Sequence, residues 1–316
     1  MDDYWEFHCG RGSFHDIHRY MLAFNNHYGE SKNVQEFAFK SQAASYDAIR
    51  AMYEAFAAHL PHTTGIVQWM LNASWPKLYW QLYDYDLTPG GAFFGVKKGA
   101  APLAVIYNYG DQGVYLVNQG VDSFANYRTA ITVYDLNSKK ILETVVTNSS
   151  SPGTSQKIYD LSSLAPTTPV YFVDLHGEDS SVKSSAADNF YWLSVKPDVL
   201  DEEKSNWFMT PNKSYADFTS LSNLAPATVT VRVSVKHRDH ARQAEVTLNN
   251  PGDTLAFFIE MKMVGAKSGQ MLTPVFWDDN YISLPPHTKK VLHVRFPEGE
   301  APELKVEGWN VKFKVR

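Results

Sequence analysis

The sequence contains a single cysteine, Cys9, among 316 residues. One thiol excludes an internal disulfide framework and any zinc or iron–sulfur site built from several cysteines. Lysine and arginine number 29 against 34 aspartates and glutamates, a formal net charge of -5, which argues against nucleic acid as a partner. No apolar run approaches the roughly 20 residues of a membrane-spanning helix. The N-terminus also lacks the basic and apolar regions of a signal peptide, so we expect no membrane partner and leave the compartment open.

Aromatic residues are concentrated in the first 100 positions, which hold 20 of the 44 Phe, Trp and Tyr residues. Hydrophobic residues make up 44% of the chain and charged residues 20%, which is typical of folded proteins with sizeable cores and excludes global disorder. Because the aromatic content changes so sharply, we expect two different architectures to share the chain.

Residues 13–60 have the hydrophobic spacing of two amphipathic helices. In the first, Phe14, Ile17, Met21 and Phe24 recur three or four residues apart, and Gly29 supplies a stop signal. In the second, Asn33 is suited to cap the helix N-terminus. The predicted apolar face of this second helix consists of Phe37, Ala44, Ala48, Met52, Ala55 and Phe56.

A short apolar run, GIVQWML at 65–71, follows the helices and is bounded by turn-forming residues. Its length is typical of a buried strand, although periodicity alone does not separate it from a helical turn. Residues 72–76 then form a loop. Two helices, a buried strand and a loop indicate an α/β arrangement.

Beyond about residue 99 the pattern becomes one of short strands. Seven stretches rich in β-branched and aromatic residues fall within about 100 residues, the density of an immunoglobulin-like β-sandwich. Residues 198–204 are highly charged and mark a boundary, and about seven further strands follow. The first group comprises 102–109, 113–118, 127–136, 141–147, 156–161, 169–177 and 188–196, and the second includes 229–235, 244–248, 257–263, 290–296 and 309–315.

Residues 64–98, TGIVQWMLNASWPKLYWQLYDYDLTPGGAFFGVKK, resemble the end of the catalytic barrel in glycoside hydrolase family 2. Within that family they are most similar to the exo-β-D-glucosaminidase and β-mannosidase branch. The upstream segments YWEFHCGRGSFHDIHRY and KSQAASYDAIRAMYEAF fit the same branch, as does FWDDNY at 276–281. The resemblance touches most of the chain, and its motifs are closest in residues 1–100.

The resemblance implies a fold class of α/β plus all-β. It predicts the C-terminal fragment of a (β/α)8 TIM barrel at 1–97, followed by immunoglobulin-like β-sandwich domains at 98–200 and 201–316. Residues 65–71 would be the eighth barrel strand. We expect such a fragment to be unstable or to associate when isolated, because an incomplete barrel exposes strand edges and apolar helix faces.

The resemblance also implies that the chemistry lies outside this chain. Retaining glycosidases use two carboxylates, and in this family these follow the fourth and seventh barrel strands, which would both precede Met1. Asp84 and Asp86 stand two residues apart, but a turn is as compatible with their spacing as a strand, and a structural role is favoured. We therefore predict no catalytic residue in this chain.

The predicted substrate-binding residues are Trp69, Asn72, Trp75 and His8. Active sites of such barrels lie at the C-terminal ends of the strands, where Trp69 would face the sugar. The expected ligand is a carbohydrate with a terminal β-linked glucosamine or mannose, and the expected partner is the missing N-terminal part of the same enzyme. No cofactor or metal is predicted. His15 and His18 have a spacing that could share a metal with Asp16 or His8, but no tight metal motif occurs.

Two functions stay open from the sequence. The first is part of a retaining exo-acting β-glycosidase that hydrolyses terminal β-glucosaminide or β-mannoside bonds, this chain lacking the catalytic carboxylates. The second is a non-catalytic accessory protein, built from β-sandwiches, that binds carbohydrate or protein. Upstream sequence carrying the first seven barrel strands would decide for the first.

Overall fold

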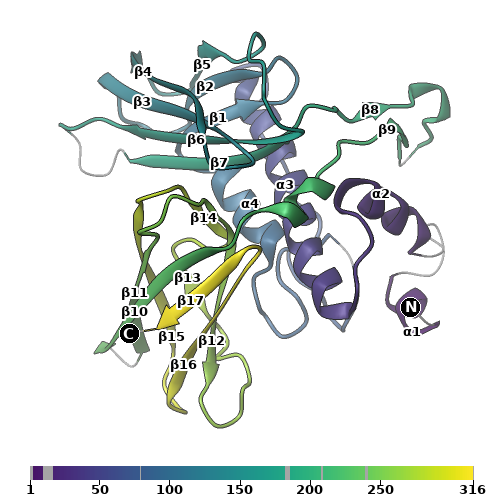
Figure 1. Cartoon of the computed structure of the whole chain (residues 1–316), viewed down its shortest axis with the longest axis vertical. Helices are drawn as coiled ribbons and strands as arrows, with labels where there is room; N and C mark the ends of the chain where they lie inside the picture. Colours follow the sequence, from purple (N-terminus) through teal and green to yellow (C-terminus); the bar gives the residue numbers. More distant parts are fainter. Residues whose placement is uncertain are drawn as a thin grey trace.

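The computed structural model describes residues 3–9, 17–78, 80–181, 186–207, 209–238 and 241–315. A helical segment at the N-terminal end stands beside two β units that are stacked one above the other (Figure 1). In the described ranges, no helix combines the length and the apolar character needed to cross a membrane.

The helical segment contains α1 (Asp3–His8), α2 (His18–Tyr28), α3 (Val34–Ala58) and α4 (Gly91–Gly99). The two predicted helices are thus confirmed in α2 and α3, and Asn33 caps α3 by accepting a hydrogen bond from the Glu36 N–H. The prediction for the first helix face is confirmed at Ile17 and Phe24, which are buried. Phe14 lies outside the described residues.

The predicted apolar face of α3 is wrong at Ala48, Met52 and Ala55, while Phe37 is buried and Ala44 packs against the core. Met52 is 54% exposed, and Ala55 is exposed as well. The buried stripe is rotated because tyrosines and a charged pair face the β units in place of Ala48, Met52 and Ala55. It consists of Phe37, Lys40, Ala43, Tyr46, Arg50, Tyr53, Glu54 and Ala57.

Helices α3 and α4 cross at very short range. A side-chain carbon at Gly91 would collide with the backbone oxygen of Gln42, and one at Gly95 would collide with that of Tyr46. The glycines therefore permit a close approach of the two backbones. This crossing places Lys98, near the end of α4, at the junction with both β units.

Residues 65–71 do not form the predicted strand. They carry no strand assignment, Val67 is 90% exposed and Trp69 is 77% exposed. A strand needs a neighbour that satisfies its backbone N–H and C=O groups. In the described ranges the backbone of this stretch is bonded only at the Leu71 carbonyl, which accepts from the Leu82 and Tyr83 N–H groups.

The first β unit consists of two facing sheets. One has the strand order β1-β2-β5 and the other β4-β3-β6-β7. Side chains from both, among them Val114, Leu116, Ile131 and Val173, form its core. The strands are β1 (Leu103–Asn108), β2 (Gly113–Asn118), β3 (Phe124–Asp135), β4 (Lys140–Ser150), β5 (Thr154–Asp160), β6 (Val170–Glu178) and β7 (Ala187–Ser194).

The second β unit also pairs two sheets, ordered β13-β15-β11-β10-β17 and β14-β12-β16. The small pair β8 (Val199–Leu200) and β9 (Asn212–Ser214) precedes it. The strands are β10 (Ala227–Arg238), β11 (Ala241–Asn249), β12 (Ala256–Gly265), β13 (Phe276–Trp277), β14 (Ile282–Leu284), β15 (Lys289–Pro297), β16 (Pro302–Gly308) and β17 (Val311–Val315).

The two β units meet through the outer face of β6 and β7. Side chains alternate between the faces of a strand, so Tyr171 and Val173 enter the core of the first unit while Phe172 points away from it. Phe172 and Trp192 contact Phe257 of β12, with ring centroids 5.5 and 5.2 Å apart. One continuous apolar cluster therefore joins the helices, this outer face and the second unit.

Candidate functional site

A pocket of about 380 Å³ lies where α1 meets the loop after residue 75 and the turn at 84–86. The side chains that line it come from these three segments. They include Tyr4, Trp5, His8, Leu78, Asp84 and Asp86. Aromatic surface beside carboxylates and an imidazole is suited to a polar ligand with flat faces, such as a sugar.

His8 occupies one wall of this pocket and is fixed by its neighbours. Its Nδ1 donates to the carbonyl oxygen of Pro76, and its own carbonyl accepts a hydrogen bond of 2.9 Å from the Leu78 N–H. The imidazole lies 5.1 Å from the Trp75 ring, and Phe7 packs edge-on against both. A neutral ring that donates from Nδ1 keeps Nε2 as an acceptor.

Asp84 and Asp86 belong to a reverse turn and not to a strand. The Asp84 carboxylate accepts a hydrogen bond of 2.9 Å from the Thr88 N–H, and the Asp84 N–H donates to the Thr88 carbonyl. Burial raises the pKa of Asp84 above its usual range. This turn supports the structural role that the spacing favoured, while it also brings both carboxyl groups to the pocket wall.

The four predicted substrate-binding residues do not all meet at this pocket. His8 lines it, whereas Trp75 packs against the His8 ring without lining the pocket. Asn72 is exposed, and its backbone forms an isolated bridge with Tyr83, the residue before Asp84. Trp69 is largely exposed and does not line the pocket. The sugar-binding roles of all four remain predictions.

Sequence reasoning overlooked the α1 residues that share the pocket with His8. Trp5 packs against Phe37 of α3, with centroids 5.6 Å apart, and this contact anchors α1 to the helical segment. The signal was present as the aromatic pair at positions 4–5, three and four residues before His8 and therefore on the same side of a helix.

The described residues give no geometric support to a metal site shared by His15 and His18. His15 and Asp16 lie outside the described residues, and His18 is exposed on α2. Among the side chains that the structure describes, no group of three or more His, Cys, Asp or Glu is arranged to hold a metal ion. Cys9 is buried at the end of α1.

The comparisons with known proteins agree with this architecture. Residues 207–311 match the exo-β-D-glucosaminidase Ig-fold domain. Over 310 residues, 97% of the chain, the sequence is 36% identical to the exo-β-D-glucosaminidase of Arthroderma benhamiae. The chain is homologous to part of the exo-β-D-glucosaminidases of glycoside hydrolase family 2. The resemblance expected from the sequence is thus confirmed.

Solved structures of the family have the same fold. The crystal structure of the Amycolatopsis orientalis exo-chitosanase matches 96% of this chain with a TM-score of 0.91 at 28% identity, and a variant of it was solved in complex with PNP-β-D-glucosamine. The β-D-mannosidase of Dictyoglomus thermophilum matches with a TM-score of 0.69 at 17% identity, which supports the fold alone. The chain spans only about a third of the length of its relatives: 35% of the Arthroderma benhamiae enzyme and 37% of the Amycolatopsis orientalis exo-chitosanase.

Proposed function

We propose that this chain is part of a retaining exo-acting β-glycosidase that hydrolyses terminal β-glucosaminides. The observation that carries the proposal is the match of nearly the whole chain to one third of an exo-β-D-glucosaminidase. In this proposal residues 1–97 complete the wall of a TIM barrel, and the sandwiches at 98–200 and 201–316 buttress it. β-Mannosides are the alternative substrates, and glucosaminides are favoured because the stronger matches carry that name.

The exposed stretch at 65–71 supports the barrel assignment. Val67, Trp69 and Leu71 present apolar surface to solvent, and their backbone lacks strand partners in the described ranges. If neighbouring barrel strands flank this stretch in the whole enzyme, it becomes the eighth strand and Trp69 faces the sugar at its C-terminal end. The His8 pocket would then border the substrate site.

The catalytic carboxylates are proposed to come from the part of the enzyme that this chain does not span. A retaining mechanism needs two carboxyl groups about 5–5.5 Å apart. Asp84 and Asp86 are committed to a tight turn, with Asp84 bonded to the Thr88 backbone. They are better suited to support the pocket wall than to attack a glycosidic carbon.

We expect this chain alone to release no nitrophenol from PNP-β-D-glucosamine. When it is joined to upstream polypeptide of the same gene that supplies the first seven strands, we expect release from that substrate and weaker release from the β-mannoside. Trp69→Ala in the joined enzyme should lower kcat/KM about 10- to 100-fold, because a stacked aromatic surface is lost.

The matched control is Trp80→Ala in the joined enzyme, which removes an equal side chain next to the pocket loop and should leave kcat/KM closer to the parent value. Turnover by the chain alone would contradict the absence of the catalytic pair. An inactive joined enzyme that still binds oligosaccharide would favour the non-catalytic accessory protein.

A second expected result concerns the apolar surface of the isolated chain. Leu22, Met52, Val67, Trp69 and Leu71 are all exposed, and large apolar side chains left in contact with water promote association. Size-exclusion chromatography with light scattering should show dimers or larger species whose proportion rises with concentration. Val67→Lys together with Leu71→Lys should shift the distribution to monomer, whereas a stable monomer of the unaltered chain would contradict the proposed missing wall.

A further inference from the structure

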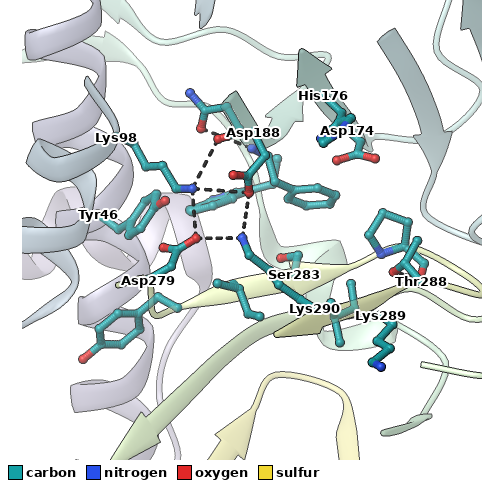
Figure 2. Close-up of a pocket in the computed structure, with 17 residues that line it drawn as sticks. Tyr46, Lys98, Asp174, His176, Asp188, Asp279, Ser283, Thr288, Lys289 and Lys290 are labelled. Carbon is teal, nitrogen blue, oxygen red and sulfur yellow. Dashed lines mark hydrogen bonds and ion pairs between the residues drawn. The ribbon is translucent and has the colours of Figure 1, made fainter. Parts of the chain in front are cut away.

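A second cavity, of about 330 Å³, lies at the junction of α4 with the two β units. The first unit contributes the polar end of the outer face of β6 and β7, and the second contributes β14, β15 and the turn between them. Figure 2 shows side chains from all three sources pointing into this space. A volume of this size is at the lower end of small-molecule sites and holds a single monosaccharide more readily than a chain.

Four of the lining residues neutralise one another. The ammonium of Lys98 lies 2.9 Å from an Asp279 carboxylate oxygen and 3.4 Å from one of Asp188. The ammonium of Lys290 lies 2.7 and 2.6 Å from the same two oxygens. Two cations and two anions therefore form a closed square, drawn with dashed lines in Figure 2.

Asp174 is a third carboxylate on the same wall, and the square does not include it. It faces the cavity from β6, where its cross-strand neighbour is Phe190, while Asp188 pairs with His176 two positions along. In the part of the chain that the structure describes, the Asp174 carboxylate has neither a hydrogen bond nor an ion pair. Figure 2 places it beside His176, apart from the dashed contacts. Burial and the nearby Asp188 raise the pKa of Asp174 to about 7.

Among the described residues, no cation is in direct contact with the Asp174 carboxylate. Of the two lysines whose charges act on it, Lys290 is shared between Asp188 and Asp279 and Lys140 pairs with Glu143. The described residues also provide no group of three ligands for a metal ion. An organic ammonium group fits better, since it donates hydrogen bonds to a carboxylate and needs no coordination shell.

The rest of the cavity lining offers hydroxyl groups and flat apolar surface. Ser283 accepts a hydrogen bond of 3.1 Å from the Phe258 N–H, so its own proton remains for another acceptor. The Thr288 hydroxyl donates to the Pro285 carbonyl and keeps its lone pairs as acceptors. Phe190 supplies a ring beside Asp174. A ligand that matches these groups carries hydroxyls on a compact ring together with an ammonium group.

We propose that this cavity binds an amino sugar, with its ammonium on the Asp174 carboxylate and its hydroxyls toward Ser283 and Thr288. The site is separate from the pocket beside His8 and is built from different elements. The inference goes beyond the proposed glycosidase function, because it concerns binding by this chain and requires no turnover.

The test is isothermal titration calorimetry on the full chain near pH 7, with D-glucosamine as the probe and D-glucose and N-acetyl-D-glucosamine as neutral comparisons. Glucosamine should bind at least about tenfold more tightly than either neutral sugar, because only it carries a charge-assisted donor. Equal binding of the three sugars, or no detectable heat with glucosamine, would overturn the proposal without any variant being made.

Variants then locate the site. Asp174→Asn should weaken glucosamine binding about tenfold or more, whereas Glu178→Gln, an equivalent change further along β6, should leave it within twofold. Trp69→Ala should also leave it unchanged, which separates this cavity from the proposed active site. Thermal unfolding monitored by circular dichroism would show that Asp174→Asn remains folded. Unaltered affinity in folded Asp174→Asn would refute the assignment, even if the glycosidase proposal holds.

Discussion

Replacing Arg50 by alanine is expected to lower the free energy of unfolding by about 3–5 kcal/mol. Arg50 is fully buried on α3, and its guanidinium donates to the Asn189 side-chain oxygen at 3.0 Å and to the Phe190 carbonyl at 2.6 Å. It also donates to Asp47 at 2.9 Å and lies over the Tyr191 ring, 4.0 Å from its centroid. One side chain thus fastens the helical segment to β7.

The loss of stability in Arg50→Ala arises from the buried polar groups that are left without a partner. Glu54 is buried one turn later, 4.0 Å from the guanidinium, and accepts hydrogen bonds from the Tyr191 hydroxyl and the Asn189 amide. Burial already raises the pKa of Glu54 to about 7. Removing Arg50 leaves that carboxyl without a nearby cation and the Phe190 carbonyl without a donor, and unpaired buried groups are costly.

Urea unfolding followed by circular dichroism measures the effect. Arg128→Ala is the matched control, since Arg128 is exposed on β3 and its loss should change the free energy by no more than about 0.5 kcal/mol. Arg50→Ala combined with Glu54→Gln should recover part of the loss, because no buried negative charge is then left at position 54. A loss below about 1 kcal/mol for Arg50→Ala would contradict the role of the buried pair.

The Arg50 pair illustrates why the face of α3 could not be predicted from sequence. Hydrophobic periodicity assumes that charged side chains face water, so it assigned Met52 and Ala55 to the interior. The structure instead buries Arg50 and Glu54, because partners for both come from β7, about 140 residues later. The existence of the helix followed from local spacing, while its orientation depended on these distant polar partners.

The β strands, in contrast, were predictable because their signal is local. Each strand's alternation of side chains is local, and Phe257 and its neighbours in β12 were recognised as one strand. The packing of the first β unit against the second, through the outer face of β6, was not predictable from sequence. That face is apolar only where it meets β12. Residues 65–71 show the opposite case, in which an apolar run lacks strand neighbours in the described ranges and stays exposed.

The candidate site was partly accessible from sequence. His8 and Trp75 were singled out through the family resemblance, and the structure brings their rings together although 67 positions separate them. The contribution of Trp5 depends on how α1 packs against α3, which no local pattern specifies. The cavity beside Asp174 is formed by three separate parts of the chain, so spacing along the sequence carried no sign of it.

Trp192→Ala is expected to destabilise the helices and both β units together, by about 3–5 kcal/mol. The indole is fully buried on the outer face of β7, where its N–H donates to the Tyr28 hydroxyl of α2 at 3.1 Å. Its ring lies 5.9 Å from that of Tyr46 on α3 and 5.2 Å from Phe257 on β12. Deletion would leave a large cavity in the shared core and a buried hydroxyl without its donor.

Differential scanning calorimetry tests whether this one side chain couples the three parts. Because the indole contacts all of them, every unfolding transition of the variant should move to lower temperature. Trp192→Phe should cause a smaller shift, since it keeps most ring contacts and loses the hydrogen bond to Tyr28. Trp69→Ala removes an equal but exposed side chain and should leave the transitions nearly unchanged. If only the first β unit were destabilised, the second unit would have to be held by other contacts, such as the Lys98 and Lys290 square that links α4 and β15 to β7.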